Sequence, residues 1–407
     1  MSARPRLLFV APWFLFPRVS GGRIRTTDVL RGMKGGAFEI TLVSPQPPDG
    51  NDRSAEIASV CDHFVSWRDD TNRSVFNRFL SLASGLPVSV ALDRSRRGRE
   101  RIARELASRP DVVVLDFVHT AVLAPTGPLP VRSVLFTHNV ESEIYGRNAD
   151  VARNALARAV WRSQRVKMER FERDAMRRFD TVVAVSERDG EFFRDELGIA
   201  NVRVIPTGVD VDFYSFAPKP GGDDLTGKGG KLVFTGSMDW RPNIDGLQWL
   251  MDEAWARIVA ASPASELVIV GRNPPRRLVA EAARRGLAWT FTGLVDDVRS
   301  YVHDADVCII PLRAGGGTRL KVYEAMALGC PVVSTAVGVE GLPLVADEHY
   351  VRAEDAEDFA AAVLRLLRDP ELRERIAAAA RKYLAANFSP RMVGRAFEEI
   401  CLEGVSR

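Results

Sequence analysis

Cysteine is scarce in this chain of 407 residues, and its four copies show no CxxC spacing. This distribution excludes a disulfide-rich scaffold and argues against a cysteine–histidine metal site, and it is typical of a reducing compartment. Long apolar runs are also missing, because no stretch approaches the roughly 18 uninterrupted apolar residues of a membrane span. The apolar start of the chain is broken by Pro12 and Pro17 and is expected to form a first strand, not a leader. We therefore expect a cytoplasmic protein.

A strong excess of one charge is absent as well, since the formal net charge is only +3. Such a balance does not favour nucleic acid as a partner. One segment, 153–178, is nonetheless basic and helix-forming, with Trp161, Val166 and Phe171 interleaved. Two interpretations stay open for it. It is either the solvated face of a packed helix or a peripheral contact with the inner face of a membrane.

The composition is that of a globular protein, with 46% hydrophobic and 27% charged residues. A chain of this length exceeds one ordinary core and is expected to form two domains. We expect an α/β domain over 1–212, a linker rich in glycine, proline and aspartate over 213–230, and a second α/β domain over 231–388. The remaining residues, 389–407, are expected to form a helix that packs back on the first domain.

Short runs of Val, Ile and Leu alternate with helical periods in both halves. The runs are RLLFV, EITLVS, DVVVLDF, RSVLFTH, DTVVAVS and VRVIP in the first half, and KLVFTG, SELVIVG, LAWTFTG, ADVCIIP and CPVVST in the second. Continuous apolar runs between helices are typical of parallel strands covered on both faces. The sequence thus predicts two doubly wound parallel sheets.

Ligands of such sheets bind where strands end and helices begin. Gly21 and Gly22 follow the first strand and precede a helix expected from about Thr26. Bare amides and a helix dipole suit an anion there, although the segment matches no standard phosphate motif and a plain turn stays an alternative. Asp116 and His119 follow the strand DVVVLDF, and they are either catalytic groups or a strand-end cap and a structural histidine.

A second glycine-rich segment follows the strand ADVCIIP. It contains Gly315, Gly316, Gly317, Thr318, Arg319, Lys321 and Glu324. Glycines let the backbone approach a phosphate, a helix start offers free N–H groups, and cationic side chains neutralise charge. A surface pair of Lys321 with Glu324 is worth only about 0.2–0.5 kcal/mol, which does not explain three consecutive glycines. The pattern therefore predicts a diphosphate-binding site.

The segment GGGTRLKVYEAMALGCPVVSTAVGVEGL resembles the donor-site motif of GT-B glycosyltransferases of family 4, a large retaining group. VSERD, IPTGVDVDFY, TGSMDWRPN, VGRNP and FTGLVDDV match further family segments in the family's order. The resemblance covers nearly the whole chain. It implies the GT-B fold, in which two Rossmann-like domains face a central cleft. It also implies a hexosyltransferase that moves a sugar, with retention, from a UDP- or GDP-sugar to a hydroxyl acceptor in polysaccharide, lipid-linked or small-molecule glycosylation.

The resemblance also assigns roles to single residues. Glu324 matches the second glutamate of the E-x7-E motif, which binds the nucleotide ribose. Gly21 and Gly22 match a glycine pair near the donor phosphates and the acceptor. Val295 falls where the backbone meets the base, and His138 matches a histidine near the reaction centre.

The sequence departs from the family pattern at two places. Gly316 stands where the first glutamate of the E-x7-E motif is expected, so recognition of the donor sugar cannot follow the standard members. The arginine and lysine that commonly hold the diphosphate after the first strand of the second domain fall at Ser237 and Asp245. Arg319 and Lys321 are therefore the expected source of charge. Arg241 is a further candidate.

No metal or cofactor is expected, because the nucleotide sugar is itself a substrate. Two alternatives remain. Another GT-B enzyme, such as a nucleotide-sugar epimerase or a glycan phosphorylase, would need an acid and histidine set or a pyridoxal lysine, and neither is evident. A two-domain ligand-binding protein is disfavoured by the lack of an export signal.

Overall fold

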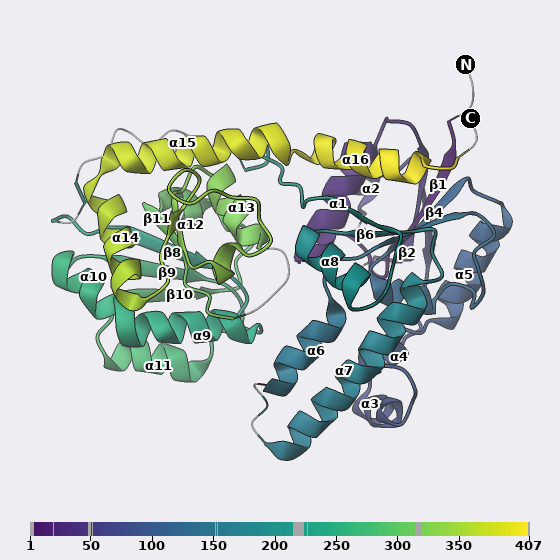
Figure 1. Cartoon of the computed structure of the whole chain (residues 1–407), viewed down its shortest axis with the longest axis horizontal. Coiled ribbons are helices and arrows are strands. Elements are labelled where there is room, and N and C mark those ends of the chain that lie inside the picture. The colour runs from purple at the N-terminus through teal and green to yellow at the C-terminus, as the bar shows by residue number, and fades with distance from the viewer. Residues whose placement is uncertain are drawn as a thin grey trace. The chain divides into compact units, whose positions relative to one another are not determined.

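The computed structural model describes residues 4–18, 20–47, 50, 52–150, 152, 154–214, 224–225, 227–314 and 319–405. The chain divides into two compact units, which are treated separately below (Figure 1). The first comprises the chain up to Gly208 together with the segment from Pro390 onward, and the second lies between Val209 and Ser389. Most of the expected linker, residues 213–230, falls outside the described residues.

The first unit contains a seven-stranded parallel sheet in the order β3-β2-β1-β4-β5-β6-β7. Its strands are β1 (Arg6–Val10), β2 (Glu39–Pro45), β3 (His63–Trp67), β4 (Val112–Asp116), β5 (Arg132–Phe136), β6 (Thr181–Ala184) and β7 (Val202–Val204). The order, which runs outward in both directions from β1, is the doubly wound arrangement of Rossmann-like domains. Strand β3 was not predicted, because this edge strand carries polar residues within HFVSW.

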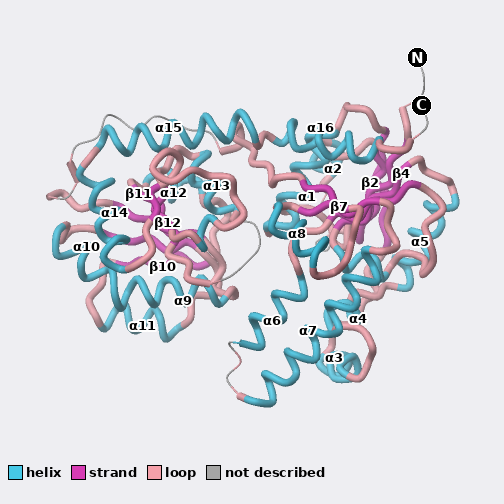
Figure 2. The backbone as a smooth tube through the Cα atoms, in the orientation of Figure 1, coloured by secondary structure: helices cyan, strands magenta, loops and turns pink. Residues whose placement is uncertain are grey.

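Helices cover both faces of this sheet (Figure 2). They are α1 (Gly21–Met33), α2 (Ser54–Ala58), α3 (Val75–Leu82), α4 (Val88–Leu92), α5 (Arg96–Ala107), α6 (Glu141–Asp150), α7 (Ala155–Met176), α8 (Glu187–Asp195) and α16 (Pro390–Leu402), with a 3₁₀ turn at Val118–Val122. Successive residues of β1 point to opposite faces. Leu7 and Phe9 pack with residues of α1 and α16, whereas Leu8 and Val10 pack with residues of α5 and α7.

Helix α16 crosses α1 at two glycines. A Cβ atom added to Gly32 would lie 1.9 Å from the carbonyl oxygen of Pro390, and one added to Gly394 would lie 2.4 Å from the carbonyl carbon of Gly32. The two backbones therefore touch, and no larger residue fits at the crossing. Glu398 adds a hydrogen bond from the backbone N–H of Ala37 at 2.6 Å. These contacts hold the terminal helix in the first unit.

The second unit contains a six-stranded parallel sheet in the order β10-β9-β8-β11-β12-β13. Its strands are β8 (Lys231–Thr235), β9 (Glu266–Val270), β10 (Trp289–Gly293), β11 (Val307–Ile310), β12 (Val332–Ser334) and β13 (Val351–Arg352). Its helices are α9 (Arg241–Trp249), α10 (Trp255–Ala261), α11 (Arg276–Arg284), α12 (Arg299–Asp304), α13 (Leu320–Ala327), α14 (Ala356–Arg368) and α15 (Pro370–Asn387), with a π-helical turn at Leu250–Ala254 and a 3₁₀ turn at Val337–Val339. The two-residue β13 was not predicted.

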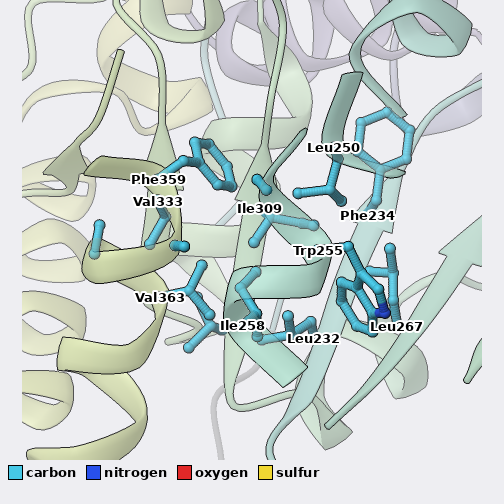
Figure 3. Close-up of a cluster of buried hydrophobic side chains, with 14 of the residues drawn as sticks. Leu232, Phe234, Leu250, Trp255, Ile258, Leu267, Ile309, Val333, Phe359 and Val363 are labelled. Carbon is cyan, nitrogen blue, oxygen red and sulfur yellow. The ribbon is translucent and has the colours of Figure 1, made fainter. Parts of the chain in front are cut away.

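One face of the second sheet carries the apolar core shown in Figure 3. The strands contribute Leu232, Phe234, Leu267, Ile309 and Val333, and the helices contribute Leu250, Trp255, Ile258, Phe359 and Val363. The π-helical turn joins α9 to α10 and keeps Leu250 and Trp255 on the sheet side, where both are almost fully buried. The core fixes the sheet, and with it the loops that follow the strands.

In the first unit, the start of helix α1 differs from the prediction. It begins at Gly21, with Ser20 at the N-cap position, and not near Thr26. Gly21 and Gly22 thus form the first turn of the helix and are not a loop that precedes it. Glycine is unfavourable inside helices but costs less at their ends, which is why the pattern was misjudged.

Candidate functional site

Asp116 and His138 form a buried hydrogen-bonded pair in the first unit. Asp116 ends β4, and His138 follows the neighbouring strand β5. Asp116 Oδ1 lies 2.6 Å from His138 Nε2, and Asp116 Oδ2 accepts a hydrogen bond from Thr26 Oγ1 at 2.8 Å. An ionised carboxylate only accepts hydrogen bonds, so the contact favours a proton on Nε2. The sequence named both residues but gave no reason to join them.

The other ring nitrogen of His138 faces the first turn of α1. Nδ1 is buried and has no hydrogen-bond partner within the described ranges. A Cβ atom added to Gly22 would lie 3.4 Å from this Nδ1 and 3.2 Å from Trp13 Cζ2. The first amides of a helix have no intrahelical partner, and the side chain of Ser20 does not cap them. This corner combines bare helix amides with an imidazole nitrogen.

Arg25, which was not predicted from the sequence, contacts the same corner of the first unit. Its Nη1 donates to the carbonyl oxygen of His138 at 3.2 Å, and its Nε donates to Thr207 Oγ1 at 3.1 Å. Burial lowers the pKa of Arg25 to about 10, an effect that the carboxylates of Asp189 and Asp116 oppose. An arginine in an amphipathic helix usually faces water, so the sequence offered no signal for this role.

His119 lies beside the Asp116–His138 pair but is not bonded to it. His119 Nδ1 lies 2.9 Å from Asp93 Oδ2, and its Nε2 lies 4.0 Å from Glu141 Oε2. Phe117, at a φ of +70°, separates the two histidines, with its ring centroid 4.5 Å from that of His119 and 5.8 Å from that of His138. His119 therefore belongs to a second, acidic cluster.

A buried carboxylate pair adjoins this cluster and was missed by the sequence analysis. Glu172 on α7 accepts hydrogen bonds from the backbone N–H groups of Glu141 at 2.7 Å and Ser142 at 3.0 Å, and so caps the start of α6. Burial raises the pKa of Glu172 to about 8, and the nearby Glu141 adds to the rise. Burial also raises the pKa of Glu141, which the neighbouring His119 opposes.

In the second unit, the Lys321 ammonium lies at the carboxyl end of β8. Its Nζ donates to Asn243 Oδ1 at 2.8 Å and lies 4.2 Å from the centroid of the Phe234 ring. A Cβ atom added to Gly236 would come within 2.8 Å of the same Nζ. Burial lowers the pKa of Lys321 to about 7. The amino group of a lysine on α13 thus reaches the start of α9.

The loop after β8 is itself organised by polar contacts. Asn243 Nδ2 donates to the carbonyl oxygen of Ser237 at 2.8 Å, and Arg272 Nε donates to Ser237 Oγ at 3.1 Å. Asp239 forms an ion pair with Arg272 at 2.8 Å. Ser237 is one of the two positions where the family pattern has a cation, and Lys321 Nζ shares Asn243 as a hydrogen-bond partner with this loop.

Arg319 is buried immediately before α13 and occupies its N-cap position. Its Nε donates to the carbonyl oxygen of Val337 at 3.2 Å, and Nη2 lies 3.8 Å from Glu340 Oε2. The guanidinium carbon lies 5.3 Å from the centroid of the Trp240 ring. Arg319 is therefore already engaged by its own unit, and of the two predicted cations Lys321 is the one placed at the carboxyl end of β8.

Glu324 lies one turn further along α13 and is partly exposed. Its Oε1 accepts a hydrogen bond from the hydroxyl of Tyr214 at 2.7 Å, and Tyr214 is almost fully buried. The tyrosine hence fixes the orientation of the carboxylate. Tyr214 ends the segment IPTGVDVDFY, but no local pattern pairs it with Glu324.

The remaining predicted residues of this unit are Arg241, Val295 and the four positions from 315 to 318. Arg241 is the exposed first residue of α9 and makes no ion pair with any described residue. Val295 is partly buried against the core of the unit, next to the exposed Leu294. The four positions Gly315, Gly316, Gly317 and Thr318 lie outside the described residues.

Both parts of the chain match known family models. Residues 19–213 match the model described as Glycosyltransferase Family 4, and residues 229–369 match the model described as Glycosyl transferases group 1. The chain belongs to these glycosyltransferases. Its two Rossmann-like parallel-sheet units are those of the GT-B fold.

Curated relatives of this glycosyltransferase include two kinds of sugar-transferring protein. A phosphatidyl-myo-inositol mannosyltransferase of Mycobacterium leprae is 34% identical over 201 residues, which are 48% of this chain and 52% of that protein. The match thus spans about half the length of that relative. A glycogen synthase of Mycobacterium tuberculosis is 25% identical, and the match covers 98% of this chain and 94% of the length of that synthase.

Among solved structures, the glycosyltransferase is similar to HepE of Anabaena, crystallised with UDP-glucose. The TM-score is 0.64 at 14% identity, over 98% of this chain and 99% of that chain. At this identity the likeness shows a shared fold. Within the described ranges of the glycosyltransferase, no group of three or more His, Cys, Asp or Glu side chains is arranged to hold a metal ion. No helix of the described part is long and apolar enough to cross a membrane.

Proposed function

We propose that the protein is a retaining hexosyltransferase that moves a sugar from a nucleoside-diphosphate sugar to a hydroxyl acceptor. The family of both halves supports this proposal, as do the names of a mannosyltransferase and a glycogen synthase among the relatives. A nucleotide-sugar donor also fits a cytoplasmic location, and the reaction uses the nucleotide sugar as a substrate without a further cofactor.

The position of the Lys321 ammonium is the observation that carries the proposal. The difficult step of sugar transfer is departure of the nucleoside diphosphate from the anomeric carbon, during which negative charge grows on the phosphate oxygens. A cation held in place beforehand stabilises this charge without reorganising in the transition state. Lys321 Nζ is fixed by Asn243 and Phe234 at the carboxyl end of β8, where open α/β sheets bind ligands.

The other groups have complementary roles in the proposed reaction. Glu324, oriented by Tyr214, accepts hydrogen bonds from the ribose hydroxyls. Arg241 adds charge at the start of α9. His138 Nδ1 forms a hydrogen bond with a sugar or acceptor hydroxyl, while Asp116 holds the ring. The bond between the anomeric carbon and the phosphate oxygen breaks, the acceptor oxygen bonds to the same face, and its proton passes to the departing phosphate.

Binding of nucleotides provides the first test. Ligand binding stabilises a protein by RT ln(1 + [L]/Kd), or about 2.7 kcal/mol at a hundredfold excess over Kd. Thermal unfolding with UDP, GDP and TDP should show stabilisation by at least one of them. Lys321→Met should lose most of that shift, whereas Lys231→Met, which removes an exposed lysine at the amino end of β8, should keep it.

Turnover provides the second test. The nucleotide that stabilises the protein is supplied as a panel of its sugar esters without an acceptor, and slow release of free nucleoside diphosphate is expected. Phosphate-dependent turnover without nucleotide sugar would instead identify a phosphorylase. Interconversion of the sugar on the nucleotide would identify an epimerase. Tight binding without turnover under any acceptor would identify a ligand-binding protein.

A further inference from the structure

An apolar face of helix α3 is exposed in the first unit. Val75, Phe76, Phe79 and Leu80 have between 59% and 70% of their surface accessible. Their spacing puts all four on one side of the helix, and no residue of this fully described helix is buried. The face therefore contributes nothing to the core of its own unit, and a contiguous apolar patch of this kind marks an interaction site.

Helix α7 adjoins the end of α3 and carries exposed apolar side chains of its own. Lys167 Nζ donates to the carbonyl oxygens of Leu82 and Ser84, both at 2.7 Å, and so ties the end of α3 to α7 (Figure 1). Leu156 lies about three turns from Lys167 on the same side of α7 and is 77% exposed, and Val166 is 59% exposed. The two helices together present apolar side chains that nothing in their unit covers.

Cations border the apolar patch. Arg78 is exposed on α3, and the exposed Arg162 and Arg170 flank Val166 at a spacing of four residues on α7. None of these three forms an ion pair with another residue of the described ranges. An unpaired arginine beside apolar side chains suits a partner that offers anionic groups next to an apolar layer.

We propose that the face formed by α3 and the exposed side of α7 docks on a membrane surface that contains anionic lipids. The aromatic side chains Phe76 and Phe79 enter the boundary between headgroups and acyl chains, and the arginines contact lipid phosphates. A second copy of the chain fits less well, because a symmetric dimer through this face would bring its unpaired arginines toward their own copies. The inference does not depend on which reaction the protein performs.

Co-sedimentation of the full chain with phosphatidylcholine vesicles, with and without phosphatidylglycerol, tests the apolar part. Binding should be stronger to the anionic vesicles at low salt and should weaken as salt screens the charges. The double variant Phe76→Ser, Phe79→Ser should bind at least about tenfold more weakly, because it lacks the two aromatic side chains that the membrane would bury. Val345→Ser removes a side chain of the second unit that is 52% exposed, and it should bind like the original protein.

A second pair of variants tests the charges. Arg162→Gln with Arg170→Gln should weaken binding to anionic vesicles by about fivefold for each arginine and should reduce the salt dependence. Arg276→Gln with Arg277→Gln removes two exposed arginines of α11 in the second unit and should have no such effect. Circular dichroism of each variant checks that the fold is retained.

Three outcomes would overturn the proposal. The first is equal binding of the original protein to neutral and anionic vesicles at low salt. The second is unaltered binding of the Phe76→Ser, Phe79→Ser variant. The third is a stable dimer that this variant dissociates, in sedimentation without lipid, together with no binding to vesicles. In that case the face would be an interface between copies of the chain.

Discussion

Lys321 gives the proposed donor site a measurable pH signature. Its pKa is lowered to about 7 because burial disfavours the charged ammonium, and Arg319 lowers it further while Cys308 and Glu324 oppose the change. A group with this pKa is protonated in about one molecule in ten at pH 8. A diphosphate within hydrogen-bond distance favours the charged form and raises the pKa again. Binding of a nucleotide sugar at pH 8 should therefore take up about 0.9 proton per site.

Isothermal titration calorimetry at pH 8, in buffers of different ionisation enthalpy, measures this uptake. A nucleotide sugar is the suitable ligand because its diphosphate is esterified at both ends. A terminal phosphate, by contrast, titrates near pH 6 and would add its own proton exchange. The uptake should fall to about 0.1 proton at pH 6, where the lysine of the free protein is already charged.

Two lysine variants make the test specific. Lys321→Met replaces the lysine with an apolar side chain of similar length and should abolish the proton uptake. It should also weaken binding by about 10- to 100-fold, which corresponds to the loss of a charge-assisted hydrogen bond of about 1.5–3 kcal/mol. Lys231→Met should change neither quantity. Tight binding of the original protein without proton uptake at pH 8, or uptake that persists in Lys321→Met, would refute the assignment.

Three further predictions concern buried groups. Because the pKa of Glu172 is raised to about 8, the folded chain binds more protons than the unfolded chain between about pH 5 and 8. The free energy of unfolding should fall over this range, and Glu172→Gln should flatten the slope measured by urea unfolding. His138→Gln keeps an amide that can donate to Asp116 but lacks Nδ1, so turnover should drop by about 100-fold or more with little change in the unfolding midpoint. Tyr214→Phe removes the hydroxyl that donates to Glu324 and should weaken nucleotide binding by about 0.5–1.5 kcal/mol in calorimetry, while binding of pyrophosphate, which has no ribose, stays as it was.

The central strands could be predicted because each is buried on both faces. A run such as VVVLD in β4 has no other stable place than the interior of a covered parallel sheet, so composition alone indicates it. Edge strands carry a weaker signal. The five residues of β3 pair with β2 alone and include the polar residues His63 and Ser66, and β13 is only two residues long. Both were missed for this reason.

Site residues could be predicted only where their signal is local. Lys321 and Glu324 stand three residues apart on one short helix, and their neighbours in the chain form a recognisable pattern. Their hydrogen-bond partners in the structure have no such local signal. Asn243 is 78 positions from Lys321 and Tyr214 is 110 positions from Glu324, so only the fold brings them together. The same holds for Glu172, which caps a helix that begins 31 positions earlier.

The order of strands explains how the second unit can lack the usual cations after β8. Strands β8 and β11 are neighbours in the sheet, so helices α9 and α13, which follow them, start at the same edge. A lysine on the first turn of α13 can therefore reach the start of α9, as the contact of Lys321 with Asn243 shows. The cation at this corner can therefore come from the segment after β8 or from the segment after β11, and it need not stand at one fixed position of the sequence. Ser237 and Asp245 can then lose the family's cations without leaving a diphosphate there unopposed, provided that Lys321 gains a proton when the ligand binds.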